Sequence, residues 1–466
     1  MTRLLACQCV LLALSAPLVA QTEEPRVVKL AIRPAAAPVI SLEYRLLPDA
    51  RAQKPGNAAP LYARAALLIP PAEKTGDRPE KLSNWASMPL ADLPRDEMRK
   101  TLTSFAIALR EAENASLQRH CDWHVPIDKE AFSLQLPELQ ELRHIARALA
   151  AKARFEIAEG RTESALQTLQ TGFATARHIA EGPTLIHAVL GVAAAKSMVH
   201  QLEELIQQPG SPNMYWALTA LPRPFIDLRT AMEHERGTLW VEFPRLRDAE
   251  RGQLTAAQLD ALKADLLRFM EFDFEAERVG WPRELRLTTA VMRAYPVAKR
   301  RLIAHGRSAS EVEALPTLQV VTIYSLQVYR ELLDASFKWS YVPYPEAWQG
   351  VNRWVENLRT EVMRREGFPF ASLLLPAWDG AYAQTAHLDR SIAALRCIEA
   401  CRLFAAAHGG RLPPSLDAVT EVPIPLDPMA AKPFVYELAG NEAILESSDA
   451  KSDPHFATRY RLTIAR

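Results

Sequence analysis

Four ionisable side chains that lie close together in the sequence are the best candidates for acid–base chemistry. They are Asp227, Glu233, His234 and Glu235, with Glu242 a little further on. Carboxylate and imidazole groups that converge in a pocket act as general base and acid, and they also bind cations. This group therefore predicts a metal-assisted hydrolase as the alternative function. The spacing departs from the H-E-x-x-H arrangement that puts two histidines on one helix face, so a solvated helix face is the competing interpretation.

The segment His120-Cys121-Asp122-Trp123-His124 is the densest group of metal-ligand residue types. Zinc sites normally have two well-formed ligand pairs, and no second pair accompanies this one. We therefore predict a packed loop anchored by Cys121 and Trp123. The acidic alternation from Glu271 to Glu277 lacks the glycine and ligand order of an EF-hand loop. The sequence accordingly predicts no metal site and no cofactor.

Aromatic residues are most frequent from Phe337 to Trp354, among several prolines. Trp339, Trp348 and Trp354 could form platforms on which sugar rings or proline-rich peptides stack. The other interpretation is that these rings cover a core where helices are interrupted. Glycan binding at the three tryptophans is thus a further hypothesis.

The N-terminal residues 1–20 have the pattern of a secretory signal peptide: Arg3, an apolar run from Leu4 to Val19, and the small residue Ala20 at the exit. We expect an extracytoplasmic protein with no membrane span after signal cleavage. Cleavage would leave Cys121, Cys397 and Cys401. Cysteines four apart on a helix have poor disulfide geometry, so we predict buried small residues, with a bridge from Cys121 as the alternative.

The composition restricts the partners. The 466 residues carry a formal net charge of zero, and no cluster of basic residues is larger than Lys299-Arg300-Arg301. Binding to nucleic acid or to anionic lipid needs a concentrated basic face. The sequence therefore predicts no nucleic acid partner and argues against anionic lipid as the main partner.

Three amphipathic segments between Pro137 and Gly210 must organise the chain. Apolar residues recur every three or four positions in each segment, which predicts helices separated by Gly160 and by Gly182-Pro183. The first two segments are joined so closely that they must pack antiparallel. In the third segment, small residues from Gly191 to Ala195 allow another helix to approach closely.

The first two helices resemble a tetratricopeptide repeat. The residues that fit its pattern of small and large positions are Ala153, Gly160, Ala165, Leu169 and Gly172, although Phe155 stands one position early. No second copy follows at the 34-residue period, which arrays of this family require. The resemblance implies one repeat-like hairpin, residues 137–182, in a larger helical domain that could bind a peptide.

Other elements follow from local patterns. Strict alternation from Val39 to Leu46 predicts a half-buried strand. Residues 74–94 are predicted as a surface linker, and residues 95–119 as one helix. We expect helix starts at Thr255-x-x-Gln258 and at Ser310-x-x-Glu313, where capping boxes are formed.

From Ser372 onward the chain resembles the globular region of a type II secretion pseudopilin or type IV pilin-like protein. The residues that carry the resemblance are a long helix, the turn Gly410-Arg411-Leu412-Pro413, Asp427-Pro428, and Pro433-Phe434-Val435-Tyr436 before a hairpin around Gly440. The apolar segment that precedes this region, Leu373 to Leu375, is much shorter than the family's apolar N-terminal helix. The whole layout resembles secreted proteins of planctomycete-type bacteria, which implies no particular activity.

The sequence thus predicts a mainly α protein, with a helical, repeat-like body and a small C-terminal α+β pseudopilin-like module. We expect a signal peptide at 1–20, a strand, helix and linker segment at 21–94, a helical domain at 95–371 and the module at 372–466. The first functional hypothesis is a non-enzymatic interaction or structural role, in which the helical body binds a protein or peptide partner.

Overall fold

The computed structural model describes residues 25–71, 78–127, 136–270, 282–364, 378–449 and 456–465. The chain forms two compact units. The described residues of the large unit lie within Ala16–Val125, Gln135–Ala231 and Ala381–Arg466, and those of the small unit lie within Pro126–Leu134 and Met232–Gly380. The fold is mainly α with a small sheet near the C-terminus, as predicted.

Three helices form the centre of the large unit: α7 (Pro137–Ala158), α8 (Thr162–Ala180) and α9 (Leu185–Leu205). Pro137 stands in the first turn of α7, where its missing N–H would have had no helical partner. Gly160 adopts a φ of 68° and reverses the chain into α8. The Thr184 side chain caps the start of α9. The three predicted helices are confirmed.

Helices α8 and α9 approach closely at Gly191. A methyl group added there would come within 2.6 Å of the Ala176 carbonyl oxygen and 2.7 Å of the Ala180 Cβ. Only glycine fits such a contact without a shift of one helix. The prediction that the small residues of the third segment allow close approach is confirmed.

Shorter elements pack around these helices. They are α2 (Ala59–Leu67), α4 (Arg78–Trp85), η1 (Leu90–Asp92), α5 (Arg95–Ser104), α6 (Ala106–Ser116), α10 (Tyr215–Thr219) and the paired strands β2 (Lys54–Asn57) and β3 (Gln118–His120). The predicted linker 74–94 therefore contains helix α4, with Leu82 and Trp85 buried. The predicted helix 95–119 is two helices, because the chain turns at the buried Phe105.

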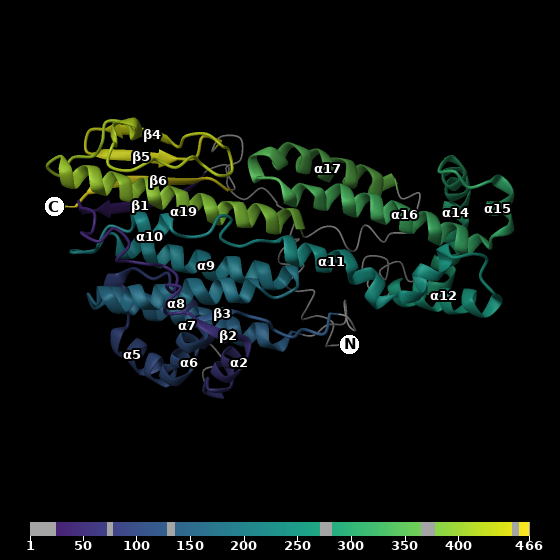
Figure 1. The fold of residues 1–466 in the computed structure, drawn as a ribbon, viewed down its shortest axis with the longest axis horizontal. Helices are drawn as coiled ribbons and strands as arrows, with labels where there is room; N and C mark the ends of the chain where they lie inside the picture. The colour runs from purple at the N-terminus through teal and green to yellow at the C-terminus, as the bar shows by residue number, and fades with distance from the viewer. Residues whose placement is uncertain are drawn as a thin grey trace. The chain divides into compact units, whose positions relative to one another are not determined.

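The sheet has the strand order β1-β6-β5-β4. Its strands are β1 (Arg26–Ile32), β4 (Val435–Ala439), β5 (Glu442–Glu446) and β6 (Thr458–Ile464). The predicted hairpin around Gly440 is confirmed. Strand β1 comes from the other end of the chain and pairs in parallel with β6, as the purple strand beside the yellow ones in Figure 1 shows.

The strand predicted at Val39 to Leu46 is wrong. Of its apolar residues Leu46 is buried, whereas Ile40 and Leu42 are exposed, and no strand pairs with the segment. The alternation alone could not supply a neighbouring strand. Strand β1 lies earlier, where Leu30 and Ile32 face the core.

Helix α19 (Trp378–Ala407) runs along the sheet (Figure 1). Near its end Leu403 and Phe404 form a buried cluster with Tyr215, Val419 and Val422. Tyr215 lies on α10, outside the predicted module. This cluster is therefore built from distant parts of the sequence, joined by hydrophobic burial.

The small unit is helical in its described part. It contains α11 (Arg229–Glu242), η2 (Pro244–Glu250), α12 (Ala256–Phe269), α14 (Arg283–Ala304), α15 (Ala309–Ala314), α16 (Thr317–Phe337), η4 (Lys338–Tyr341) and α17 (Tyr344–Arg364). The capping box at Thr255 and Gln258 is confirmed. The second box is formed by Ser308 and Glu311, so the predicted cap at Ser310 is wrong by two residues.

Three sequence-based predictions fall outside the described residues. They concern the signal peptide at 1–20, the acidic alternation from Glu271 to Glu277 and the apolar segment from Leu373 to Leu375.

Candidate functional site

The acidic and histidine residues predicted for acid–base chemistry lie at the surface. Asp227 belongs to the large unit, and Glu233, His234 and Glu235 belong to the small unit. The Asp227 carboxylate accepts two bonds from Arg229 Nε, at 3.0 and 2.9 Å. Its partial burial raises the pKa, but these bonds outweigh burial and leave the pKa of Asp227 below its usual value. Asp227 is thus a paired carboxylate, which is poorly suited to act as a base.

The other three residues lie on α11. Glu233 and His234 are exposed and Glu235 is half-buried. Glu233 accepts a hydrogen bond from the Tyr341 hydroxyl. Among the residues that the structure describes, no group of three or more His, Cys, Asp or Glu side chains is placed to hold a metal ion. The solvated helix face is the interpretation that this geometry favours.

The segment from His120 to His124 is a packed loop. Cys121 is buried, and its backbone N–H donates to Glu181 Oε2 at 2.5 Å. Trp123 stacks on Tyr62 with ring centroids 5.8 Å apart, and its indole N–H donates to the His178 carbonyl at 2.9 Å. The two predicted anchors are confirmed.

The three tryptophans of the aromatic segment differ in exposure. Trp354 is only 8% exposed and packs 5.7 Å from Trp378. Trp339 is half-buried and covers Gly350, while Trp348 stacks on Tyr344 at 5.3 Å. Burial of Trp354 removes it from any glycan platform, so that part of the hypothesis is wrong.

Cys121, Cys397 and Cys401 are free thiols in the interior, as the prediction of buried small residues required. The alternative bridge from Cys121 is not formed. Burial raises the pKa of the Cys401 thiol to about 12. A thiol that stays protonated is a weak nucleophile, so Cys401 acts here as a small apolar side chain.

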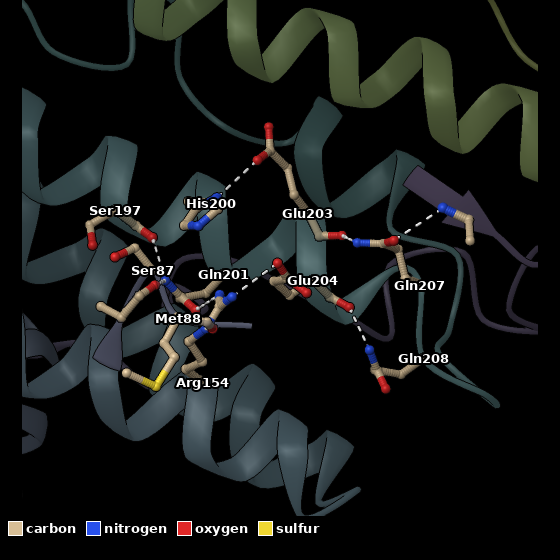
Figure 2. A network of polar contacts seen from close by, with 12 residues as sticks. Ser87, Met88, Arg154, Ser197, His200, Gln201, Glu203, Glu204, Gln207 and Gln208 are labelled. Atoms are coloured by element: carbon tan, nitrogen blue, oxygen red, sulfur yellow. Dashed lines mark hydrogen bonds and ion pairs between the residues drawn. The ribbon is translucent and has the colours of Figure 1, made fainter. Parts of the chain in front are cut away.

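Polar groups that the sequence patterns did not single out lie on α9. We call Lys196, His200, Gln201, Glu203 and Glu204, with their partners, the α9 network; Figure 2 labels His200, Gln201, Glu203 and Glu204. Helix α9 has the length and hydropathy of a membrane-spanning helix, and 61% of that apolar window is buried inside the fold. Its polar residues therefore need partners within the protein.

On one flank of α9 the network surrounds Arg154 of α7, which is 1% exposed. The guanidinium donates to the Met88 carbonyl at 2.6 Å, to Gln201 Oε1 at 3.1 Å and to Glu204 Oε1 at 3.0 Å (Figure 2). Gln201 in turn donates to the Ala86 carbonyl at 2.8 Å. These bonds tie α7 and α9 to the turn that follows α4.

On the other flank Glu203 is buried and accepts two hydrogen bonds. The Tyr460 hydroxyl of β6 donates to Oε1 at 2.8 Å, and His200 Nδ1 donates to Oε2 at 3.1 Å. Burial, and then Glu203, raise the pKa of Tyr460 well above its ordinary value. The carboxylate thus joins the helical body to the sheet.

Lys196 lies one turn before His200 on the same face. It donates to Gln384 Oε1 of α19. Burial, with the nearby charge of Arg26, lowers the pKa of the Lys196 ammonium to about 8. The spacing 196, 200, 203 on an apolar helix was the sequence signal for this flank, but the partners Tyr460 and Gln384 are far away in the sequence.

Helix α19 carries a second set of buried charges. Glu399 and Arg402 are both fully buried and pair at 2.7 Å. Arg402 also donates to the carbonyls of Arg33 and Ser211, at 2.9 and 2.8 Å, and Glu399 accepts from the backbone N–H of Met214 at 2.8 Å. Each charge is therefore satisfied by a different segment of the large unit, as buried ions require.

A small pocket lies between α19 and the sheet. It is lined by Arg390, Ser391, Ala394, Phe434, Leu445, Glu446, Ser447, Thr458 and Tyr460, and the room for the centre of a water molecule is about 10 Å³. Such a volume accommodates one water and no larger ligand. Among the residues that the structure describes, the buried Ser447 hydroxyl has no hydrogen-bond partner, and it is the group that such a water would satisfy.

The loop of residues 33–47 is fixed at both ends and apolar in the middle. Gln170 of α8 donates to the carbonyls of Arg45 and Leu47, at 3.1 and 3.2 Å, and Arg402 holds the Arg33 carbonyl. Between these anchors Val39 and Ile40 are exposed, Ile40 to 68%. We call Val39, Ile40 and Leu42 the apolar tip.

The described side chains thus form buried hydrogen bonds and ion pairs within the protein, an exposed apolar tip, and ion pairs at the surface. Comparisons of the chain with protein-family models, with curated proteins and with solved structures found no match.

Proposed function

We propose that this chain is an exported, non-enzymatic interaction protein whose helical body presents the apolar tip to a protein or peptide partner. The observation that carries the proposal is the contrast between a fixed base and an exposed apolar middle in the 33–47 loop. Exposed apolar side chains that stand together mark interaction surfaces more often than single ones do. The proposed extracytoplasmic location is inferred only from the sequence pattern of residues 1–20.

The anchored ends of the 33–47 loop support this proposal, because they reduce the conformational entropy that the loop loses when a partner binds. Four hydrogen bonds fix the two ends: Arg402 to the Arg33 carbonyl, Ala35 to the Arg402 carbonyl, and Gln170 to Arg45 and Leu47. A turn closed by the Glu43 N–H and the Ile40 carbonyl, at 2.9 Å, holds the tip itself. Preorganised loops lose less freedom when a partner covers them.

The polar groups of the α9 network fit a structural role. Arg154, Gln201 and Glu203 each direct their hydrogen bonds to other parts of the same unit. Such bonds hold helices at fixed spacing, which a presenting scaffold needs. We therefore assign these side chains to the scaffold, and we place binding at the tip.

The test compares proteins recovered from the native envelope with three baits. They are the wild type, the Ile40→Ser/Leu42→Ser variant, and the Leu67→Ser/Ile107→Ser control, whose targets are exposed on α2 and α6. We expect a partner retained by the wild type and the control and reduced at least tenfold by the tip variant, as loss of a hot spot predicts. Intact mass of the recovered wild type also shows whether cleavage follows Ala20. A partner that binds the tip variant equally well contradicts the proposal.

A further inference from the structure

The outer face of α14 in the small unit carries a row of arginines at seven-residue intervals. Arg286 and Arg293 lead to Arg300, and Arg307 follows just after the helix end. Seven residues make almost two helical turns, so the side chains of Arg286, Arg293 and Arg300 project from nearly the same side of the helix. Between Arg286 and Arg300 the row extends about 21 Å along the axis.

The opposite side of α14 is the one that packs into the unit. Its buried residues are Leu287, Val291, Ala294, Ala298 and Leu302. Arg293 and Arg300 are exposed, and Arg286 and Arg307 are half-buried. Arg293 and Arg300 therefore make no contribution to the core and are available to an external partner, whereas Nε and Nη1 of Arg286 are buried.

The charge of this face is only partly balanced locally, where Arg307 lies near the Glu311 carboxylate of α15. From Arg283 to Arg307 the chain has six arginines and one lysine against a single glutamate. That glutamate, Glu284, is 3.9 Å from Lys263, and Lys299 pairs with Glu313. Among the described residues, Arg293, Arg300 and Arg301 take part in no ion pair. The face therefore has an excess of positive charge.

Apolar side chains lie beside the row. Leu285 is 50% exposed and Met292 is 66% exposed, each directly before an arginine of the row. Exposure of Leu and Met side chains to water is unfavourable, whereas both side chains could insert at the boundary between lipid headgroups and acyl chains. Successive residues of a helix lie about 100° apart, so Leu285 and Met292 flank the row. A basic row flanked by exposed apolar side chains is the pattern of an interfacial helix.

We propose that the α14 face binds peripherally to a bilayer rich in anionic phospholipid. Duplex nucleic acid would use the arginines but would leave Leu285 and Met292 in water, because phosphate contacts need no apolar side chain. Binding to the bilayer uses both features. This role is separate from the apolar tip of the large unit.

The experiment measures co-sedimentation of the full mature chain with phosphatidylglycerol/phosphatidylcholine vesicles and with vesicles of phosphatidylcholine alone. We expect binding to the anionic vesicles only, weakened as salt screens the charges. Arg293→Gln/Arg300→Gln should lower the affinity about thirtyfold, since each cation near such a surface contributes about a factor of five. Arg110→Gln/Arg353→Gln, two exposed arginines on α6 and α17, is the matched control and should bind as the wild type does.

A second variant distinguishes lipid from other polyanions. Met292→Ser should weaken vesicle binding several-fold and leave binding to a soluble DNA duplex unchanged. Circular dichroism confirms that each variant keeps its helices. Equal binding to neutral vesicles, unchanged binding of the double arginine variant, or tighter binding to duplex DNA than to anionic vesicles would each overturn the proposal.

Discussion

Arg154 shows what a single buried charge does in this protein. It is 1% exposed, and its bonds reach the turn after α4, Gln201 and Glu204. A guanidinium offers five N–H donors in a fixed plane, so it can hold several segments at set distances. The ion pair of Glu399 and Arg402 acts in the same way on α19. These residues explain why charges occur on otherwise apolar helices.

Two buried histidines make the stability of the large unit depend on pH. His178 contacts the Tyr62 hydroxyl at 3.1 Å, and His187 contacts the Thr184 hydroxyl at 2.8 Å. Burial lowers the pKa of each imidazole to about 4, from 6.5. The folded state therefore favours neutral histidine, and protons bind more tightly to the unfolded chain.

We expect the two histidines to lower the stability as the pH decreases from about 6.5 toward 4, by up to about 3 kcal/mol for each histidine. Urea unfolding followed by tryptophan fluorescence between pH 4 and 8 measures this. In His178→Gln/His187→Gln the slope over this range should become much smaller. The same pH dependence of the midpoint in the wild type and in the double variant would contradict the assignment.

At the scale of elements, the seam between α8 and α9 depends on the absence of a side chain at Gly191. We predict that Gly191→Leu destabilises the protein by about 3 kcal/mol, because the new side chain would meet the Ala176 carbonyl and Ala180. Ala193→Leu, at an exposed position of the same helix, should change stability by less than about 0.5 kcal/mol. The shift in thermal midpoint measures both. Similar thermal midpoints for the two variants would show that α8 and α9 can move apart at Gly191 without loss of stability.

The helices could be predicted well and the strands poorly, for a physical reason. Periodicity and punctuation at Pro137, Gly160 and Gly182 locate α7, α8 and α9, since both signals are local. A strand needs a neighbour, and the neighbour of β1 is β6, at the other end of the chain. Alternation at Val39 to Leu46 therefore predicted a strand where no neighbour exists, while β1 itself was missed.

The same distinction applies to the candidate sites. The spacing of Lys196, His200 and Glu203 can be read from the sequence, but Tyr460 and Gln384 cannot be assigned to them without the fold. The arginine row of α14 was visible as a seven-residue period. A search for consecutive basic residues does not detect this period. For that reason the charge pattern alone argued against anionic lipid as the main partner.

At the scale of the molecule, the C-terminal region is not self-sufficient. Its sheet takes β1 from the N-terminal side, and its core takes Tyr215. The charges of Glu399 and Arg402 are satisfied by Met214, Ser211 and Arg33. Without these segments the helix would expose apolar surface and leave buried ions with unpaired groups.

We therefore predict that residues 372–466 expressed alone lack a cooperative unfolding transition and aggregate. A matched fragment that also carries residues 25–33, joined through a flexible linker, gains β1 and should recover part of the structure. Heating followed by circular dichroism distinguishes the two. A sharp transition in residues 372–466 alone would show that the region folds independently.

The pairing of β1 with β6 also imposes an order of events on folding. Arg26 is aligned with Thr458, more than four hundred residues later. A ribosome that has made the first strand must complete nearly the entire polypeptide before that strand has a hydrogen-bonding neighbour. Until then the central helices can assemble, while the first strand remains open to chaperones and to the machinery that moves unfolded chains.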